Sequence, residues 1–394
     1  MEPNEELIQL KEKLINKIIR TPLEFTDEEF EQLKKMEISF LDLRQMLIRI
    51  FDINEASLKQ ESDATTGIMG LLNRSSTKRR QKKYFALIKK KFRVPTSQNS
   101  NHKLIVAEGD SWFQFPVFIK DIIDWLQNEP DYAIYSIAYG GDWFANILYE
   151  EKYIEELSIH RPDVFLISGC GNDFVGSSRL AIMVDNKGKC RMRKEEELKQ
   201  MLKDEKYKNE ITTGYRYITE AFYSFIWTIK LQYWLLFHNL GKSDKYTQMK
   251  IITQGYDYAI PTYKRRWKKW YRLQPLLNMA IGSGKWLKRP MMIKGISDEE
   301  LSKKILKALI FEINYMFIQL AHEFPNVYHV DCRNTAEGFN DWFDELHLHS
   351  EGYRRIALAY KKCINGEIAD KVIQVGNKGK GIVTLLQKEK ESIH

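Results

Sequence analysis

Short apolar runs recur between residues 103 and 330 of the chain, and each run ends in a small or polar turn. They lack the polar alternation of a half-exposed strand, and this pattern is typical of strands buried on both faces of a parallel sheet. Amphipathic stretches between the runs, such as 117–128 and 298–323, predict covering helices. We therefore expect an α/β fold, a three-layer α/β/α sandwich with a parallel sheet of about five strands. The expected strands are 104–107, 133–138, 164–168, 251–253 and 327–330.

The same pattern divides the 394 residues into regions. Residues 1–94 have apolar positions at helical spacing and predict a helical N-terminal region. The polar, proline-containing segment 95–102 predicts a linker. The α/β pattern then extends over 103–365, and 366–394 is expected to be a C-terminal tail.

Two insertions, at about 174–248 and 256–297, interrupt the α/β pattern. Both are expected to be helical and to lie over the carboxyl ends of the strands, where insertions in open α/β folds are placed. The first contains an aromatic stretch at 217–238, which suits either a lid or acyl-binding helix, or a core helix that packs the insertion.

Composition indicates a folded chain, with 43% hydrophobic and 29% charged residues. The net charge of +8 is concentrated in three basic segments, 74–93, 264–272 and 285–294. These segments favour an anionic partner, and we expect a membrane surface bound through 74–93 and 264–272, or, as the less favoured alternative, a nucleic acid. Solvated helix faces are the other interpretation. The oligomeric state is left open.

The cysteines argue against a disulfide scaffold or a zinc ribbon, because no CxxC pair is present. The N-terminus is charged and lacks the apolar stretch of a secretory signal. We expect a cytoplasmic, reduced protein, either free or peripheral to the inner membrane surface. The four cysteines are Cys170, Cys190, Cys332 and Cys363.

Polar residues follow the predicted strands at their carboxyl ends, where ligands bind in parallel α/β sheets. These segments are 109–111, 140–142, 171–173 and 255–257. A further polar segment, 344–353, lies near the C-terminus and contains two histidines.

Four segments resemble, in order, the sequence blocks of SGNH (GDSL-type) hydrolases, over about two thirds of the chain. Gly-Asp-Ser-Trp at 109–112 is similar to the first block, and 136–141 is similar to the second, although Ser136 stands where that block usually begins with Asn. Gly-Cys-Gly-Asn-Asp at 169–173 matches the third block, and Asp-x-x-His at 344–347 matches the last. The resemblance implies a flavodoxin-like SGNH fold and activity without a cofactor.

The resemblance also implies a role for each matching residue. Ser111 would be the nucleophile, His347 the base and Asp344 the group that orients the base. The oxyanion hole would consist of the Ser111 N–H, the Gly141 N–H and the Asn172 side chain, with the adjacent Gly140 as the alternative to Gly141. His349 is the alternative base, two residues after His347.

Elementary chemistry fits these residue types. A serine hydroxyl is a poor nucleophile and needs an adjacent base, and imidazole titrates near the working pH. A carboxylate on the other ring nitrogen fixes the tautomer, and backbone or amide N–H groups stabilise the oxyanion. The remaining histidines lack the spacing of metal ligands, so no metal site is expected.

The sequence therefore predicts a serine hydrolase that cleaves a carboxylic ester through an acyl-enzyme on Ser111. The aromatic stretch and the basic segments favour a lipid or long-acyl substrate. The alternative is a basic nucleic-acid- or membrane-binding interaction protein in which the hydrolase domain is secondary or inactive.

Overall fold

The computed structural model describes residues 5–54, 67–92, 102–115, 119–203, 205–262 and 284–376 of the chain. Most of the expected linker, the basic segment 264–272 and the end of the expected tail lie outside the described residues.

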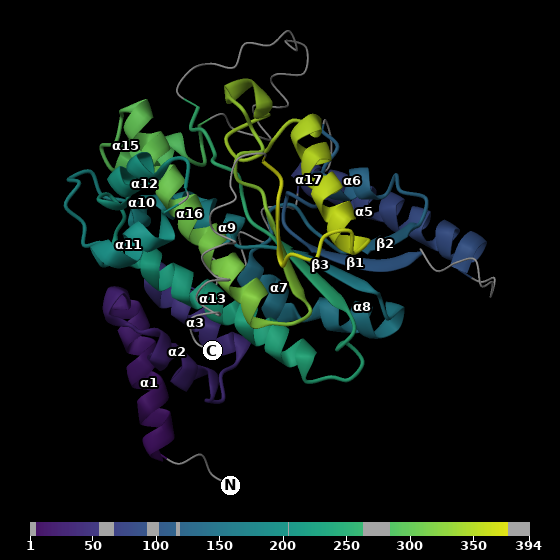
Figure 1. Cartoon of the computed structure of the whole chain (residues 1–394), viewed down its shortest axis with the longest axis horizontal. Helices are drawn as coiled ribbons and strands as arrows, with labels where there is room; N and C mark the ends of the chain where they lie inside the picture. The colour runs from purple at the N-terminus through teal and green to yellow at the C-terminus, as the bar shows by residue number, and fades with distance from the viewer. Residues whose placement is uncertain are drawn as a thin grey trace.

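Within this part of the chain, six parallel strands form one sheet in the order β2-β1-β3-β4-β5-β6 (Figure 1). The first five strands lie at the five predicted apolar runs, which confirms the predicted α/β class. The sixth was not predicted and lies in the segment expected to be a tail. The strands are β1 (Lys103–Gly109), β2 (Tyr132–Ser136), β3 (Val164–Ser168), β4 (Lys250–Gln254), β5 (Val327–Asp331) and β6 (Val372–Gln374).

Helices flank both faces of the sheet. On β2, the Tyr132 hydroxyl lies 2.6 Å from the side chain of Asn365, at the end of α17 (Ser350–Ile364). The Tyr135 ring instead packs against His160 of α8 (Lys152–His160), with ring centroids 4.1 Å apart. Two strand residues at an odd spacing point to opposite faces, so α17 and α8 belong to different layers. Helix α6 (Ile122–Leu126) packs beside α17, and α16 (Glu299–Glu323) packs on β4 and β5.

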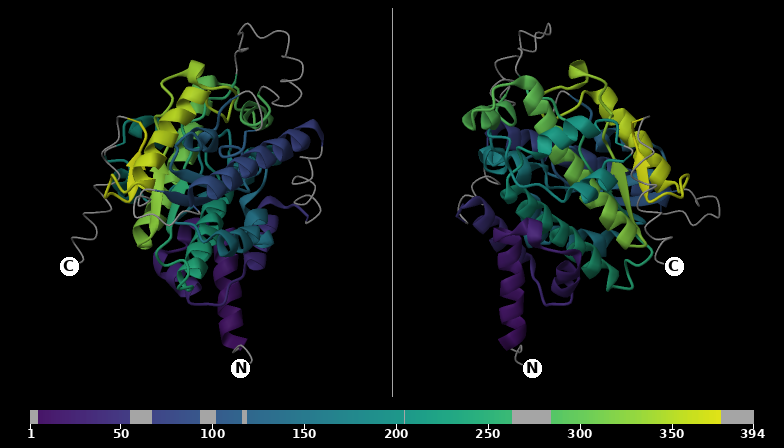
Figure 2. Two further views of the ribbon diagram at one scale, coloured as in Figure 1. Left: turned by 90° about the vertical axis from the view of Figure 1, so that its right-hand side faces the viewer. Right: turned by 60° about the vertical axis from the view of Figure 1, so that its left-hand side comes forward.

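The N-terminal helices α1 (Glu5–Arg20), α2 (Asp27–Lys34) and α3 (Phe40–Phe51) gather at one end of the molecule (Figure 2). Capping boxes begin α2 and α3, in which Thr26 and Ser39 pair with acidic residues three positions on. Both α1 and α3 pack against α13 (Glu220–Gly241), and α16 also packs against α13. Because α13 is covered on several sides, it is apolar nearly all round. The aromatic stretch 217–238 thus forms a core helix.

Helix α5 (Gly67–Leu87) lies apart from the other N-terminal helices and packs along β2, which is an edge strand of the sheet (Figure 1). Its Tyr84 hydroxyl lies 2.9 Å from the ring of His160 on α8. The helix therefore covers the strand edge that would otherwise be open.

Helix α16 is the one described helix that is long and apolar enough to cross a membrane, and 78% of its apolar window is buried inside the fold. The remaining helices are short. They are η1 (Pro22–Glu24), η2 (Ile88–Phe92), α7 (Phe144–Glu150), α9 (Gly171–Val175), η3 (Gly176–Ser178), α10 (Leu180–Met183), α11 (Glu195–Met201), α12 (Lys208–Tyr215), α15 (Lys288–Ile293) and η4 (Phe339–Asp341).

Candidate active site

A hydroxyl, an imidazole and a carboxylate form one hydrogen-bonded chain at the carboxyl edge of the sheet. The Nε2 atom of His347 lies 2.7 Å from Oγ of Ser111. The Nδ1 atom of the same ring lies 2.9 and 2.8 Å from the two carboxylate oxygens of Asp344. The structure thus brings together the three residues that the sequence singled out.

The turn after β1 presents Ser111 at this edge. A Cβ at Gly109 would lie 2.5 Å from the carbonyl oxygen of Ser168 on β3, so only glycine fits at the end of this strand. The N–H groups of Phe113 and Gln114 then donate to the Asp110 carbonyl at 3.1 and 3.0 Å, which closes one tight turn. Ser111 lies in that turn.

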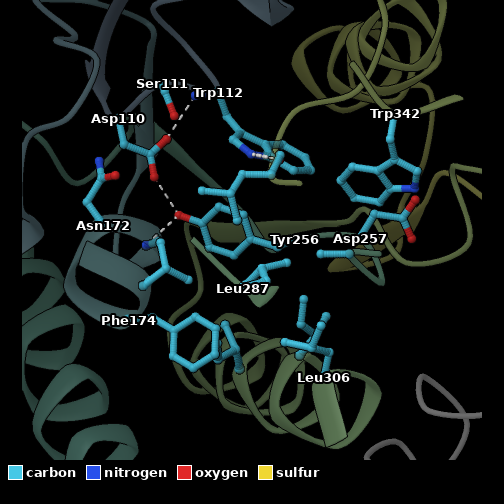
Figure 3. Close-up of a pocket in the computed structure, with 16 residues that line it drawn as sticks. Asp110, Ser111, Trp112, Asn172, Phe174, Tyr256, Asp257, Leu287, Leu306 and Trp342 are labelled. Atoms are coloured by element: carbon cyan, nitrogen blue, oxygen red, sulfur yellow. Dashed lines mark hydrogen bonds between the residues drawn. The ribbon is translucent and has the colours of Figure 1, made fainter. Parts of the chain in front are cut away.

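Asp110 braces the turn from below (Figure 3). Its carboxylate accepts from the Tyr256 hydroxyl at 2.6 Å, from the Trp112 N–H at 3.0 Å and from the Ser168 hydroxyl at 3.2 Å. The Tyr256 hydroxyl in turn accepts from the Gly171 N–H at 2.8 Å. Burial raises the pKa of Asp110. The network joins the carboxyl ends of β1, β3 and β4 beneath the serine.

The loop before α17 carries the imidazole and its carboxylate. Asp344 accepts from the Leu346 N–H at 2.7 Å and from the His347 N–H at 2.8 Å, so the loop folds around this side chain. Burial opposes ionisation of Asp344, but the charge of His347 and these hydrogen bonds hold its pKa below the ordinary value. His349 immediately precedes α17, and its ring packs against Phe343. Of the two histidines in this loop, His347 is the one that contacts Ser111.

The two other expected oxyanion donors lie on neighbouring segments. Gly141 has a φ of 97°, a conformation that glycine adopts without strain. A Cβ at Gly140 would lie 2.7 Å from the Gln114 carbonyl oxygen, so this loop approaches the serine turn closely. The Asn172 amide donates to the Asp142 carbonyl at 2.8 Å, which ties the two segments together. An amide nitrogen carries two N–H groups, and this contact uses one of them.

A cavity of about 40 Å³ opens beside Ser111. Asn172 and Asp257 contribute polar atoms to its wall, but most of the lining is apolar (Figure 3). The apolar residues are Trp112, Phe174, Val175, Ala259, Leu287, Leu306, Ile310, Ile313, Trp342 and Leu346. The site can therefore hold a small apolar group next to a serine hydroxyl.

Glu345 is a residue of the site region that the sequence analysis missed. Its buried carboxylate accepts four backbone N–H groups, from Thr262, Trp286 and Leu287 at 2.9 Å and from Lys288 at 3.0 Å. These donors lie on both sides of the undescribed segment 263–283. Glu345 thus fastens the second insertion to the loop that carries the imidazole. No sequence pattern indicates this role, because the partners of Glu345 are backbone groups.

Arg80 is a second residue that the sequence analysis missed, because it lies in the basic segment 74–93. Its side chain is fully buried and lies 2.6 Å from Asp121 and 3.0 Å from Asp124. It also donates to the Phe113 carbonyl at 2.6 Å and to the side chain of Gln114. This one cation of the segment therefore supports the serine turn and does not belong to a surface.

Neither metal ligation nor a thiol site is indicated among the described residues. No three His, Cys, Asp or Glu side chains gather there in a group that could hold a metal ion. Cys170, beside the site, is buried, and burial raises the pKa of its thiol, which disfavours a thiolate.

No protein family matches the sequence, and no curated protein matches it either. Among solved structures, the fold is similar to that of a protein described as a GDSL-like lipase from Parabacteroides merdae (13% identity, TM-score 0.34, covering 67% of this chain and 95% of that chain). It is also similar to an extracellular lipase from Streptomyces rimosus (13% identity, TM-score 0.35, covering 72% of this chain and 98% of that chain). A third similar structure is an acetyl xylan esterase variant from Geobacillus stearothermophilus (10% identity, TM-score 0.31, covering 67% of this chain and 94% of that chain). At these values the likeness is distant, and the chemistry of the site rests on its own geometry.

Proposed function

We propose that this chain is a serine hydrolase of the SGNH (GDSL-type) kind that cleaves a carboxylic ester. The observation that carries the proposal is the hydrogen-bonded chain from Ser111 through His347 to Asp344. A hydroxyl in contact with an oriented imidazole is the arrangement that activates serine for acyl transfer.

In the proposed reaction, the Ser111 oxygen attacks the ester carbonyl carbon while Nε2 of His347 takes the hydroxyl proton. The carbonyl oxygen becomes an oxyanion, which accepts hydrogen bonds from the Ser111 N–H, the Gly141 N–H and the Asn172 side chain. Each such donor contributes about 3 kcal/mol to lowering the barrier. The imidazolium then gives its proton to the leaving alcohol, and a covalent acyl-serine remains. Water, deprotonated by the same imidazole, releases the acid and restores the hydroxyl.

The acyl group would occupy the apolar cavity beside Ser111. Its volume of about 40 Å³ favours a short acyl chain over the long-chain lipid ester that is the other candidate from the sequence. Esters of p-nitrophenol with acetyl, butyryl and decanoyl groups would decide between them. The short-chain proposal fails if kcat/KM rises toward the decanoyl ester.

The nucleophile is tested by labelling the intact protein with a fluorophosphonate and mapping the adduct by mass spectrometry. We expect the adduct on Ser111, and we expect Ser111→Ala to lose both the label and the hydrolysis of p-nitrophenyl acetate. Ser75→Ala, at an exposed position of α5, is the matched control. Hydrolysis that survives in Ser111→Ala would refute the assignment.

Peripheral binding to an anionic membrane is a second proposed property, which the exposed cations of α5 and η2 support. Arg80 is buried, but seven other described cations of the segment are exposed. They are Arg74, Lys78, Arg79, Lys82, Lys83, Lys89 and Lys90. No acid occurs within 74–93, and Arg79 lies 3.5 Å from Asp124 of a neighbouring helix. Asn73 of the same helix donates to the Gly140 carbonyl at 3.3 Å, so a surface bound by α5 would lie near the proposed site.

Co-sedimentation tests this second property with vesicles of phosphatidylcholine alone or mixed with phosphatidylglycerol. We expect the protein to bind the vesicles that contain phosphatidylglycerol and not those of phosphatidylcholine. Salt should weaken this binding, and so should the combined change Lys78→Glu, Lys82→Glu and Lys89→Glu. A duplex DNA of mixed sequence is the parallel arm. Tighter binding to DNA than to the vesicles would favour the nucleic-acid alternative.

A further inference from the structure

A second cavity lies away from Ser111, between the N-terminal helices and the first insertion. Its volume is about 580 Å³, well above the 40 Å³ beside Ser111 and within the range of small-molecule sites. Its walls come from residues 22–28, from 191–201, from α13 and from α16. Figure 1 shows these elements side by side, with α2 and α13 at the lower left.

Helix α16 separates the two cavities. It turns Leu306, Ile310 and Ile313 toward the cavity at Ser111. It turns Glu312, Met316 and Gln319 toward the larger one. Each set repeats at spacings of four and three residues, so the two sets form two different stripes of one helix. The larger cavity is therefore a distinct site and no extension of the first.

Lys230 of α13 lines this larger cavity and is nine-tenths buried. Its ammonium lies over the rings of Phe30 and Trp227, at 4.9 and 4.8 Å from their centroids. The nearest carboxylate is that of Asp27, at 3.7 Å, and this side chain is 76% exposed. Among the described residues no acceptor lies within hydrogen-bond distance of Nζ. Burial lowers the pKa of Lys230.

A second cation of the cavity, the partly buried Arg193, is neutralised. Arg193 lies 2.6 Å from Glu312 and 2.6 Å from Glu197, so both of these acids are engaged. Lys230 has no comparable partner, and a buried charge without a hydrogen-bonded counter-ion is costly. The buried hydroxyl of Tyr223, on the same wall, also has no partner among the described residues. These two polar groups would gain most from an incoming acceptor.

One part of the wall is apolar, although polar side chains such as Thr26 and Glu28 also line the cavity. Phe25, Met201, Ile226 and Trp227 are all buried and line the cavity. A ligand that suits the site therefore needs an anionic oxygen at one end and an apolar body.

We propose that this cavity binds an amphiphilic carboxylate, with the carboxylate on Lys230 and an alkyl chain against Phe25, Ile226 and Trp227. Binding supplies the ammonium of Lys230 with a hydrogen-bonded counter-ion, which Asp27 at 3.7 Å does not provide. Because the site is built by residues 22–28 as well as by the insertion, it gives the N-terminal helices a part in ligand recognition. The proposal does not depend on esterase activity.

The test uses the full-length Ser111→Ala protein, so that reaction at the serine plays no part, and isothermal titration calorimetry with decanoate. We expect saturable one-to-one binding, at least 10-fold weaker binding of decanol, and at least 10-fold weaker decanoate binding in Lys230→Met. Lys242→Met, at the exposed end of α13, is the matched control and should bind as the parent does.

A second variant protects the test against misfolding. Ile226→Trp fills the apolar wall, keeps Lys230 and is also expected to abolish binding. Near-ultraviolet circular dichroism checks the packing of each variant. Equal affinity for decanol and decanoate, unchanged binding in Lys230→Met, or the absence of decanoate binding in the parent protein would overturn the proposal. Competition by a fluorophosphonate that has reacted with Ser111 in the wild-type protein would assign the binding to the smaller cavity and would overturn it as well.

Discussion

The imidazole of His347 lies 2.7 Å from the hydroxyl of Ser111, although the two residues are 236 positions apart in the chain. One residue lies in the turn after β1 and the other in the loop before α17. Both segments sit at the carboxyl edge of the sheet, and the parallel topology is what brings them together. The contact is therefore a product of the whole fold, and it can be tested through either loop.

His347→Ala should lower kcat for p-nitrophenyl acetate by about 10³-fold or more, because Ser111 loses its base. His349→Ala removes a ring that packs on Phe343 and should keep activity within about threefold, since surface and rim changes are usually mild. Steady-state kinetics of both variants gives the comparison. A larger loss in the His349 variant would transfer the base to that residue.

Glu345→Gln should destabilise the protein and reduce kcat. The amide NH2 replaces an oxygen that accepts two backbone N–H groups, and these lose their acceptor. We expect a loss of about 3 kcal/mol in the free energy of unfolding. Urea titration measures it, and Glu337→Gln, at an exposed position nearby, is the control. Wild-type stability and kcat in Glu345→Gln would mean that the anchoring is unimportant.

Arg80→Met should cost about 3–5 kcal/mol, because Asp121 would be left buried without its counter-charge. Activity should fall too, since Arg80 also holds the Phe113 carbonyl of the serine turn. Lys78→Met, an exposed change on the same helix, should be nearly neutral. Thermal unfolding of the two variants separates a structural arginine from one that belongs to a charged surface.

Asp257 should make stability depend on pH. It accepts the N–H groups of Tyr258 and Asn334 at 2.7 Å and of Ala336 at 2.6 Å, and burial raises its pKa to about 7 from an ordinary 3.8. The folded state therefore binds more protons than the unfolded state between these values. The protonated Asp257 therefore adds to the free energy of unfolding at low pH. This contribution, at most about 4 kcal/mol, is lost as the pH rises through about 7.

Asp257→Asn cannot titrate, so the change in unfolding free energy between about pH 4 and pH 8 should be smaller than in the wild type. Urea unfolding at both pH values measures it. Asp370→Asn, at an exposed position, should keep the wild-type difference. An identical pH dependence in the Asp257 variant would contradict the raised pKa.

The sheet could be predicted from the sequence because its five longer strands are buried on both faces and stand out as apolar runs. Strand β6 could not, since Val372, Ile373 and Gln374 are too short a run to distinguish from a loop. The gathering of polar residues at the carboxyl edge of the sheet could also be predicted. Ser111 and Asn172 follow predicted strands, and Asp344 and His347 are close in sequence.

Residues that act through tertiary contacts escaped prediction for physical reasons. Arg80 stands among exposed cations, and only the folded chain reveals Asp121 and Asp124 beside it. Glu345 binds backbone groups that any sequence carries. Lys230 interrupts an apolar stretch, but the cavity that it lines needs residues 22–28, far away along the chain.

Strand β6 matters to anyone who prepares a shortened form of the protein. Its three residues pair in parallel with His329, Val330 and Asp331, and so cover the outer side of β5. A polypeptide cut after residue 365 would leave this ladder of N–H and C=O groups open to strands of other molecules. Such a polypeptide is expected to precipitate, whereas one that continues through residue 376 keeps the border of the sheet sealed.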